Sequence, residues 1–141
     1  MEINGIEVEL DLRYSEMNLS EGIMKALEQK GFTLATTGSG KTFAFGIPMV
    51  EHTDPEGTDV TGLILAPTRE LALQIQEELR QLCAFLPGIR IACLYGGQPI
   101  DRQINHLKKR PQIVVATPGR LMDHMKRRTV RLDKVQTVVL D

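Results

Sequence analysis

The amino-acid sequence predicts an α/β protein built on an open, doubly wound, mainly parallel sheet. Four short apolar runs between residues 61 and 140 are separated by three amphipathic segments, the alternation that parallel βαβ units produce. Polar or glycine-containing segments follow the apolar runs, where strands lead into helices. The length of 141 residues and the hydrophobic content of 42% suit one continuous core. We therefore expect a single domain over residues 1–141.

The N-terminal part of the chain is expected to contain a helix. Residues 21–30 carry apolar side chains on one face, Ser20 can cap the helix, and Gly31 suits its end. Residues 32–36, FTLAT, then provide no more than a short strand before a glycine-rich stretch. Only this short strand thus separates the expected helix from the glycine-rich stretch.

The rest of the chain alternates regularly between strands and helices. Residues 69–86 place Leu71, Ile75, Leu79 and Leu82 on one side of a helix. We expect this side to pack against the sheet. The expected strands are 61–66, 89–95, 112–117 and 137–140, and the other expected helices are 99–109 and 118–128.

Composition excludes several classes of protein. No apolar run approaches the roughly 18 residues of a membrane span, and the acidic N-terminus lacks the cationic flank of a signal peptide. Cys83 and Cys93 form no CxxC pair, and His52, His106 and His124 are far apart in the sequence. We expect a soluble cytoplasmic protein without a membrane partner, with reduced thiols and no zinc.

The net charge of −1 conceals a gradient along the chain. Residues 1–100 carry 7 Lys and Arg against 14 Asp and Glu, whereas residues 101–141 carry 10 against 4. Such asymmetry can mark a nucleic-acid-binding surface. The basic triplets at 108–110 and 126–128 could equally be solvated helix ends, where cations favour the helix dipole. Charge alone leaves both interpretations open.

The stretch ATTGSGKT, residues 35–42, has the composition of a phosphate-binding loop. Gly38 and Gly40 allow a tight turn in which successive N–H groups face one anion, and the following helix adds its N-terminus. Lys41 adds a positive charge near the β- and γ-phosphates, and the hydroxyl of Thr42 suits Mg²⁺. The strict pattern begins with glycine where this chain has alanine, so a simple glycine-containing turn is the alternative.

Three further loops follow predicted strands. In LAPTRELA, Thr68 can cap a helix, and Arg69 lies near the carboxyl end of the strand. In ATPGR, Thr117, the Gly119 N–H and Arg120 could donate to phosphates, and the glycines of YGGQ permit close backbone approach. Ordinary turn chemistry explains each loop nearly as well. Four such loops on one edge, however, suit a phosphate-bearing cofactor beside a phosphate-bearing polymer.

Taken together, these motifs resemble a known family. ATTGSGKT, APTRELA, GG, TPGR and the terminal VVLD occur in the order and at the separations of the first RecA-like domain of DEAD-box ATP-dependent RNA helicases. The resemblance covers nearly the whole chain, and PTRELA combined with TPGR is far more specific than a phosphate loop alone. It implies a RecA-like P-loop fold, ATP and Mg²⁺ as cofactors, RNA as a partner, and a second RecA-like domain in the full-length protein.

The resemblance also implies roles for individual residues. Tyr14 matches the aromatic residue that stacks on adenine, Lys41 and Asp141 match catalytic residues, and Thr42 and Asp141 match the Mg²⁺ site. The residues implied in phosphate binding are Thr37, Gly38, Ser39, Gly40, Lys41 and Thr42, and those implied along the RNA backbone are Pro67, Thr68, Arg69, Gly97, Thr117, Gly119 and Arg120.

Two departures from the family concern catalysis. After Phe32 the family continues with a Thr-Pro-Ile-Gln segment, a helix and a full strand, whereas here Ala35 follows within three residues, so the adenine-reading Gln is absent. Asp141 matches the first Asp of the Asp-Glu-Ala-Asp motif, but the Glu that polarises the attacking water does not follow. The chain is therefore interpreted as an internally deleted and C-terminally truncated first RecA-like domain. We expect reduced stability, weak and poorly base-selective nucleotide binding, near-background ATP hydrolysis and no unwinding.

Two alternatives remain open. The first is a fragment of a DNA-acting helicase or of another P-loop NTPase, which the combination of PTRELA and TPGR disfavours. The second is a non-catalytic RNA-binding fragment that uses the basic C-terminal part of the chain. A salt-sensitive RNA affinity without nucleotide dependence would favour the second alternative.

Overall fold

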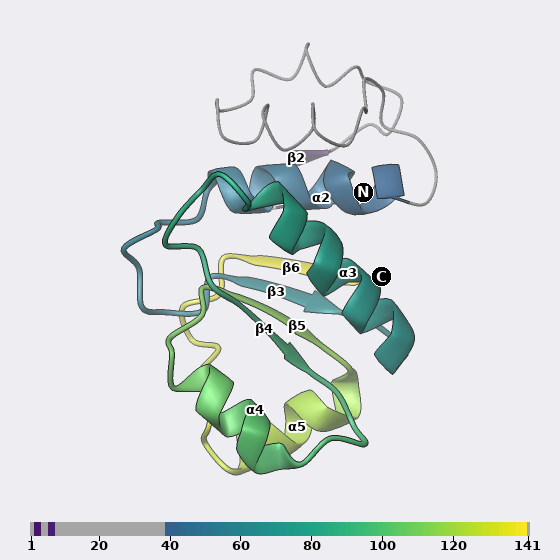
Figure 1. Cartoon of the computed structure of the whole chain (residues 1–141), viewed down its shortest axis with the longest axis vertical. Helices are drawn as coiled ribbons and strands as arrows, with labels where there is room; N and C mark the ends of the chain where they lie inside the picture. Colours follow the sequence, from purple (N-terminus) through teal and green to yellow (C-terminus); the bar gives the residue numbers. More distant parts are fainter. Residues whose placement is uncertain (1, 4–5, 8–38, 141) are drawn as a thin grey trace.

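The computed structural model describes residues 2–3, 6–7 and 39–140 of the chain. Helices and strands alternate along the continuous part, as Figure 1 shows. The helix expected after Ser20 and the short strand expected at 32–36 lie outside the described residues. The strands are β1 Glu2–Ile3, β2 Ile6–Glu7, β3 Gly62–Leu65, β4 Ile91–Leu94, β5 Ile113–Ala116 and β6 Thr137–Leu140, and the helices are α2 Ser39–Glu51, α3 Arg69–Leu82, α4 Ile100–Leu107 and α5 Pro118–Lys126.

Strands β3 to β6 form one parallel sheet in the spatial order β4-β5-β3-β6. Helices α2 and α3 cover one face of this sheet, and α4 and α5 cover the other (Figure 1). The predicted α/β fold with a doubly wound sheet is therefore confirmed. The register pairs Leu65 with both Ala116 and Leu140, and Ala116 with Leu94, so all four strands end at the same edge.

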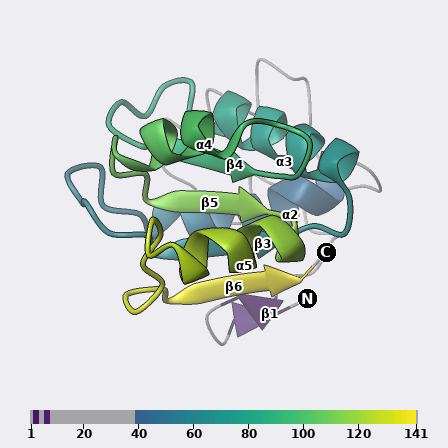
Figure 2. The ribbon, with the colours of Figure 1, turned by 90° about the horizontal axis from the view of Figure 1, so that it is seen from below.

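Strands β1 and β2 form a short antiparallel pair that the sequence did not predict. Figure 2 shows β1 beside β6, at the side of the sheet opposite β4. Each strand of the pair has two residues. Hydrophobic periodicity needs at least four to eight residues to indicate a strand, so it could not reveal this pair.

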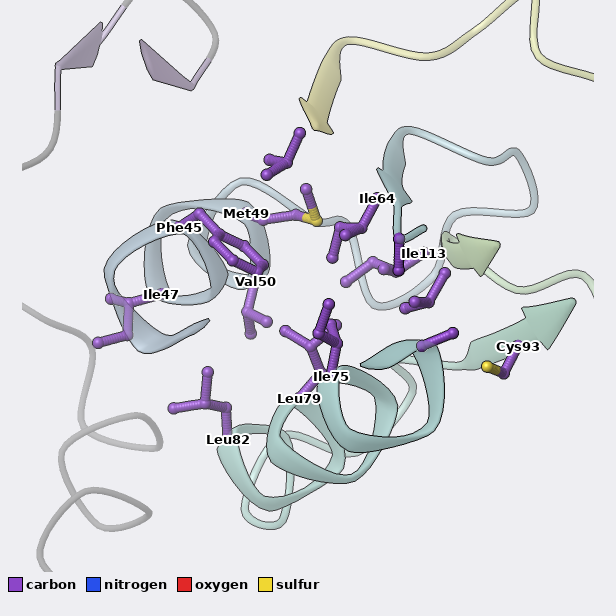
Figure 3. Close-up of a cluster of buried hydrophobic side chains, with 14 of the residues drawn as sticks. Phe45, Ile47, Met49, Val50, Ile64, Ile75, Leu79, Leu82, Cys93 and Ile113 are labelled. Carbon is purple, nitrogen blue, oxygen red and sulfur yellow. The ribbon is translucent and has the colours of Figure 1, made fainter. Parts of the chain in front are cut away.

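The larger hydrophobic core fills the space between the sheet and helices α2 and α3 (Figure 3). Phe45 of α2, Leu79 of α3 and Ile64 of β3 are completely buried there. The two helices approach closely at Gly46, where an added Cβ would lie 2.9 Å from a methyl carbon of Leu79. This contact explains a glycine in the middle of a helix, where glycine otherwise lowers stability. Helix α2 is thus fixed to the domain by its buried face.

A second, smaller core lies on the other face of the sheet. Leu107 of α4 and Leu121 of α5 pack with Val114 of β5 and Leu94 of β4. Residues 113 to 116 are buried at every position, which explains why this strand reads as a continuous apolar run rather than an alternating one.

Both cysteines are free thiols. Cys93 of β4 is buried in the larger core, and Cys83, directly after α3, packs against it. Burial away from water raises the pKa of each thiol to about 12.

Helix α3 begins as predicted but ends earlier. The hydroxyl of Thr68 accepts a hydrogen bond from the Leu71 N–H at 3.2 Å, which confirms the predicted cap. The predicted end at residue 86 is wrong, because the helix stops at Leu82 and the Leu86 N–H donates to the Cys83 carbonyl in a separate turn. Pro87 directly follows Leu86, and a residue that precedes proline disfavours helical backbone geometry. Leu86 therefore does not continue the helix.

Helix α5 also ends before the predicted residue 128. The Thr129 N–H donates to the His124 carbonyl at 3.0 Å, and the Arg128 N–H donates to the Met125 carbonyl at 3.1 Å. These two bonds form a Schellman cap, in which the residue after the C-cap takes the left-handed conformation. Arg128 occupies this position with φ 57°, so the chain leaves the helix two residues early.

Two polar side chains, Gln112 and Arg90, hold the loops at the amino edge of the sheet. The side-chain oxygen of Gln112, which is only 1% exposed, accepts from the Arg90 backbone N–H at 2.8 Å. Its side-chain nitrogen donates to the carbonyls of Asp54 at 3.0 Å and Gly88 at 2.9 Å. The Arg90 guanidinium donates to the carbonyls of Gly88 at 2.7 Å and Arg110 at 3.0 Å. Three connecting segments are thereby tied together.

Candidate functional site

Three of the loops singled out in the sequence meet at the carboxyl edge of the sheet. The Ala66 N–H donates to the Ala116 carbonyl at 2.9 Å, and the Thr117 N–H donates to the Leu94 carbonyl at 2.9 Å. The loops that follow β3, β4 and β5 therefore start side by side. This confirms the expectation that these loops share one edge.

Arg69 connects the first of these loops to the second. Its guanidinium carbon lies 5.0 Å from the centre of the Tyr95 ring, within the range of a cation–π contact. Gly97, which follows in the second loop, has φ 85°, and an added Cβ would lie 3.3 Å from Nη1 of Arg69. Both the backbone conformation and the space therefore favour glycine at this position.

Arg120 connects the third loop to the second. Its Nη1 donates to the Gln98 carbonyl at 2.9 Å and to the side-chain oxygen of Gln103 at 3.3 Å. Its Nε lies 3.8 Å from a carboxylate oxygen of Asp123, and the side chain is 15% exposed. Arg120 thus fixes the backbone of the glycine-containing loop, a role that sequence reasoning did not assign to it.

A buried pair, Gln103 and His124, lies beneath these loops, and both side chains are 0% exposed. The Gln103 nitrogen donates to the Tyr95 carbonyl at 2.8 Å. Because a carbonyl can only accept, the Gln103 oxygen must face His124, whose Nε2 lies 2.9 Å away and carries the proton. On the other side of the ring, Nδ1 lies 2.7 Å from the Thr129 hydroxyl. The pair therefore joins α4, α5 and the glycine-containing loop.

Sequence reasoning missed this pair, although a signal was present. Gln103 lies at the spacing of Ile100 and Leu107, on the apolar face of α4, and His124 lies one helical turn after the buried Leu121 in α5. A polar residue on an apolar helix face indicates a buried hydrogen-bonded group.

His124 is expected to make the stability of the chain pH-dependent. Burial is the main cause that lowers its pKa below the usual 6.5, the charge of Arg120 lowers it further, and Asp123 partly opposes this. Above pH 6.5 the ring is neutral in both folded and unfolded chains, so its contribution is complete. As the pH falls below 6.5, His124 is protonated in the unfolded chain but stays neutral in the folded chain. Stability is then lost at up to about 1.4 kcal/mol per pH unit, until the pH reaches the folded pKa.

The measurement is urea unfolding from pH 7.5 to pH 5, compared with His124→Asn. We expect the variant to be less stable at pH 7.5 but to lose less stability on acidification. Parallel curves for the two proteins would show that His124 does not carry this dependence.

The structure leaves the residues of the three loops accessible to different degrees. Pro67, Thr68, Arg69, Gly97 and Gly119 are exposed, whereas Thr117 and Arg120 are half-buried. No side-chain hydrogen bond from Thr117 caps α5, and its hydroxyl lies 3.5 Å from the Leu94 carbonyl, the outer limit of a hydrogen bond. The edge thus presents backbone groups, a hydroxyl and one exposed guanidinium to a ligand.

The expected nucleotide site is only partly within the described residues. Helix α2 begins at Ser39, and Thr42 in its first turn is buried. Tyr14, Thr37, Gly38 and Asp141 lie outside the described residues, as do the side chains of Ser39 and Lys41. In the described part of the chain, no group of three His, Cys, Asp or Glu side chains is placed to hold a metal ion.

A parallel sheet with glycine-containing loops gathered at its carboxyl edge belongs to the doubly wound α/β class, in which ligands bind at this edge. The chain belongs to the DEAD/DEAH box helicase family, because the model of that family matches residues 20–141. Among residues 2–3, 6–7 and 39–140, no helix is long and apolar enough to cross a membrane.

Curated relatives and a solved structure support this assignment. The chain is 45% identical to the ATP-dependent RNA helicase CshA of Listeria monocytogenes over 92% of its own length and 29% of the relative's length. It is 43% identical to the DEAD-box ATP-dependent RNA helicase CshA of Bacillus subtilis over 94% and 31%. A crystal structure of a DEAD box protein from the hyperthermophile Methanococcus jannaschii matches with a TM-score of 0.82 at 37% identity, covering 92% of this chain and 41% of that one.

The chain thus spans about 30% of the length of these two curated relatives. The two alignments are 150 and 153 residues long, longer than the 141-residue chain. Both relatives therefore contain residues that have no counterpart here.

Proposed function

We propose that the chain is the ATP-binding and RNA-binding part of a DEAD-box ATP-dependent RNA helicase, formed by a first RecA-like domain. The observation that carries the proposal is the carboxyl edge, where Arg69 and Arg120 join the three loops into one surface. Such a surface suits an RNA strand, because phosphates and 2′-hydroxyls can be bound by backbone groups without reading the bases. A curated relative bears the name of an RNA helicase, which agrees with this assignment.

On the RNA side, each residue of the edge has a distinct role in the proposal. Arg69 and the hydroxyl of Thr117 donate to phosphates, while Gly97 and Gly119 let the strand approach the backbone. Pro67 and Thr68 hold the start of α3, and Arg120 keeps the glycine-containing loop in register. The bound strand then runs along the ends of β3, β4 and β5.

On the nucleotide side, Thr37 to Thr42 would bind the phosphates, with Lys41 placing a positive charge beside them. Tyr14 would stack on the base, and Thr42 with Asp141 would bind Mg²⁺. The described start of α2 fits this assignment, because a helix N-terminus favours an anion. The metal would neutralise charge on the phosphates, and a second RecA-like domain is proposed as the partner that completes the site. The proposed location is the cytoplasm.

RNA binding is tested with Arg69→Ala and the matched control Arg80→Ala. Both residues are exposed arginines of α3, but only Arg69 lies at the carboxyl edge. Using a fluorescein-labelled 10-nucleotide single-stranded RNA, we expect Arg69→Ala to weaken binding about tenfold and Arg80→Ala less than about twofold. Equal effects of both variants would contradict the proposed interface. The DNA strand of the same sequence should bind more weakly if the 2′-hydroxyls are recognised.

Nucleotide binding is tested by thermal unfolding with and without Mg-ADP, in parallel with Lys41→Ala. A ligand that binds only the folded chain raises the unfolding midpoint with its concentration. We expect an increase for the original chain and none for Lys41→Ala. If Mg-ADP left the unfolding midpoint of both proteins unchanged, the proposed nucleotide binding would be contradicted, and only the proposed RNA binding would remain.

A further inference from the structure

The basic triplets at 108–110 and 126–128 meet at the amino edge of the sheet, away from the loops described above. A pocket of about 440 Å³ opens there between the ends of α4 and α5 and the segments that precede β3 and β6. Each strand of the sheet has four residues, so the two edges are separated by roughly 13 Å of strand. The pocket is therefore distinct from the carboxyl edge.

Five cationic side chains line this pocket. None of them forms an ion pair with another residue in the described part of the chain, and all are exposed. If these cations were only solvated helix ends, cations from separate segments would not need to gather around one depression. The five residues are Lys108, Arg110, Arg128, Arg131 and Lys134.

The floor of the pocket is apolar. Leu107, Pro111 and Val130 line it and are buried. Asp59 and Asp133 also line the pocket, so the excess of positive charge is three. A volume of several hundred Å³ with an apolar floor and charged walls has the dimensions of a site for a small ligand.

The backbone gives a second, independent observation. Arg110 and Arg128 are the two residues other than glycine with positive φ in the described part of the chain, 59° and 57°, and both line the pocket. Glycine takes this conformation without the steric cost that a Cβ imposes. The Arg90 guanidinium holds the Arg110 carbonyl at 3.0 Å, which supports the conformation at one of the two sites. Arginine therefore occupies two positions where glycine carries less steric cost, and both arginines line the pocket.

We propose that this pocket is a second anion site, which binds consecutive phosphate groups of a nucleic-acid backbone or of a free polyphosphate. Three of its five cations are arginines, whose planar guanidinium groups form paired hydrogen bonds with phosphate oxygens. Phosphates linked in series carry closely spaced charges that can engage several of the five cations together. The site goes beyond the proposed function, because no residue of the carboxyl edge lines it.

The test compares two triple variants of the 141-residue chain with the same change of charge. The pocket variant is Arg110→Gln, Arg128→Gln and Arg131→Gln. The control variant is Lys109→Gln, Lys126→Gln and Arg127→Gln, which replaces exposed neighbours that do not line the pocket. With sodium tripolyphosphate in calorimetry, we expect the pocket variant to lose at least about tenfold in affinity and the control less than about threefold. Equal losses would overturn the proposal, because bulk charge would then explain the binding.

A second arm separates the two sources of phosphate. A 12-nucleotide oligouridylate is titrated in the Arg69→Ala background, where the carboxyl edge is weakened. A further loss of RNA affinity in the pocket variant assigns the site to nucleic acid, whereas a loss confined to tripolyphosphate assigns it to a free polyphosphate. Polyglutamate that binds as tightly as tripolyphosphate, in the same pocket-dependent way, would overturn phosphate as the ligand. Failure of the proposed function would instead appear as equal RNA binding by Arg69→Ala and Arg80→Ala.

A single substitution guards against misfolding of the triple variant. In Arg128→Gly the left-handed position receives the residue that suits it, so we expect the unfolding midpoint to rise by a few degrees. The same variant should lose about threefold or more in tripolyphosphate affinity. A more stable protein with unchanged affinity would overturn a role for this arginine in the pocket.

Discussion

Replacing Gln112 with alanine is expected to lower the free energy of unfolding by about 3 kcal/mol. The substitution leaves the Arg90 N–H without its acceptor and removes the donor that joins the Asp54 and Gly88 carbonyls. Each buried group that loses its partner costs about 1 to 3 kcal/mol, and a cavity is left where the side chain was. Urea unfolding followed by circular dichroism measures the difference.

The matched control for this prediction is Gln136→Ala. Gln136 also precedes a strand, β6, but its side chain is exposed. We expect a change within about 0.5 kcal/mol for this variant. If Gln112→Ala were as mild as the control, the loops at the amino edge would be held by their backbone contacts and by Arg90, not by the amide of Gln112.

Replacing Gln103 with leucine is expected to cost about 2 to 4 kcal/mol of stability and to weaken RNA binding. Leucine has a similar volume, so the main effect is electrostatic: the Tyr95 carbonyl and the Nε2–H of His124 both lose their partner. Arg120 loses one of the two acceptors of its Nη1 and keeps the Gln98 carbonyl, which weakens the connection between α5 and the glycine-containing loop. Unfolding in urea gives the first quantity, and anisotropy of the labelled 10-nucleotide RNA gives the second.

Asn105→Leu on the same helix is the control for Gln103→Leu. Asn105 is exposed, so the same kind of exchange there should change neither stability nor RNA affinity appreciably. At a temperature where Gln103→Leu is fully folded, an RNA affinity equal to that of the original chain would show that the pair beneath the loops is structural only. The nucleotide-dependent rise of the unfolding midpoint should persist in Gln103→Leu, because the pair does not reach α2.

The elements of the fold could be predicted because their signals are local. The apolar run at 112–117 and the hydroxyl of Thr68 before α3 indicate a strand and a helix start within a few residues of sequence. The hydrogen bonds of Gln112 connect it with Arg90 and Asp54, 22 and 58 residues away. No periodicity within one segment contains that information, so such polar connections emerge only from the tertiary structure.

The candidate site also contains some residues whose positions could be predicted from the sequence and others whose positions could not. Arg69 and Thr117 could be placed at the carboxyl edge, since Thr117 directly follows a strand and Arg69 lies four residues after the end of another. The engagement of Arg120 with the Gln98 carbonyl could not, because it depends on how α5 lies beside the preceding loop. The convergence of Arg110 and Arg128 on one pocket was equally hidden, since the two helix ends are separate in the sequence.

The buried thiol of Cys93 and the half-buried thiol of Cys83 offer an internal reporter of opening. With a pKa of about 12, only about one thiol in 10⁵ is ionised at pH 7 while the chain is folded. Alkylating reagents and oxidants attack the thiolate, so the folded chain should be nearly inert to them. In the unfolded chain the same groups return to ordinary reactivity. The rate at which iodoacetamide labels the protein therefore counts excursions from the native state, without any engineered probe.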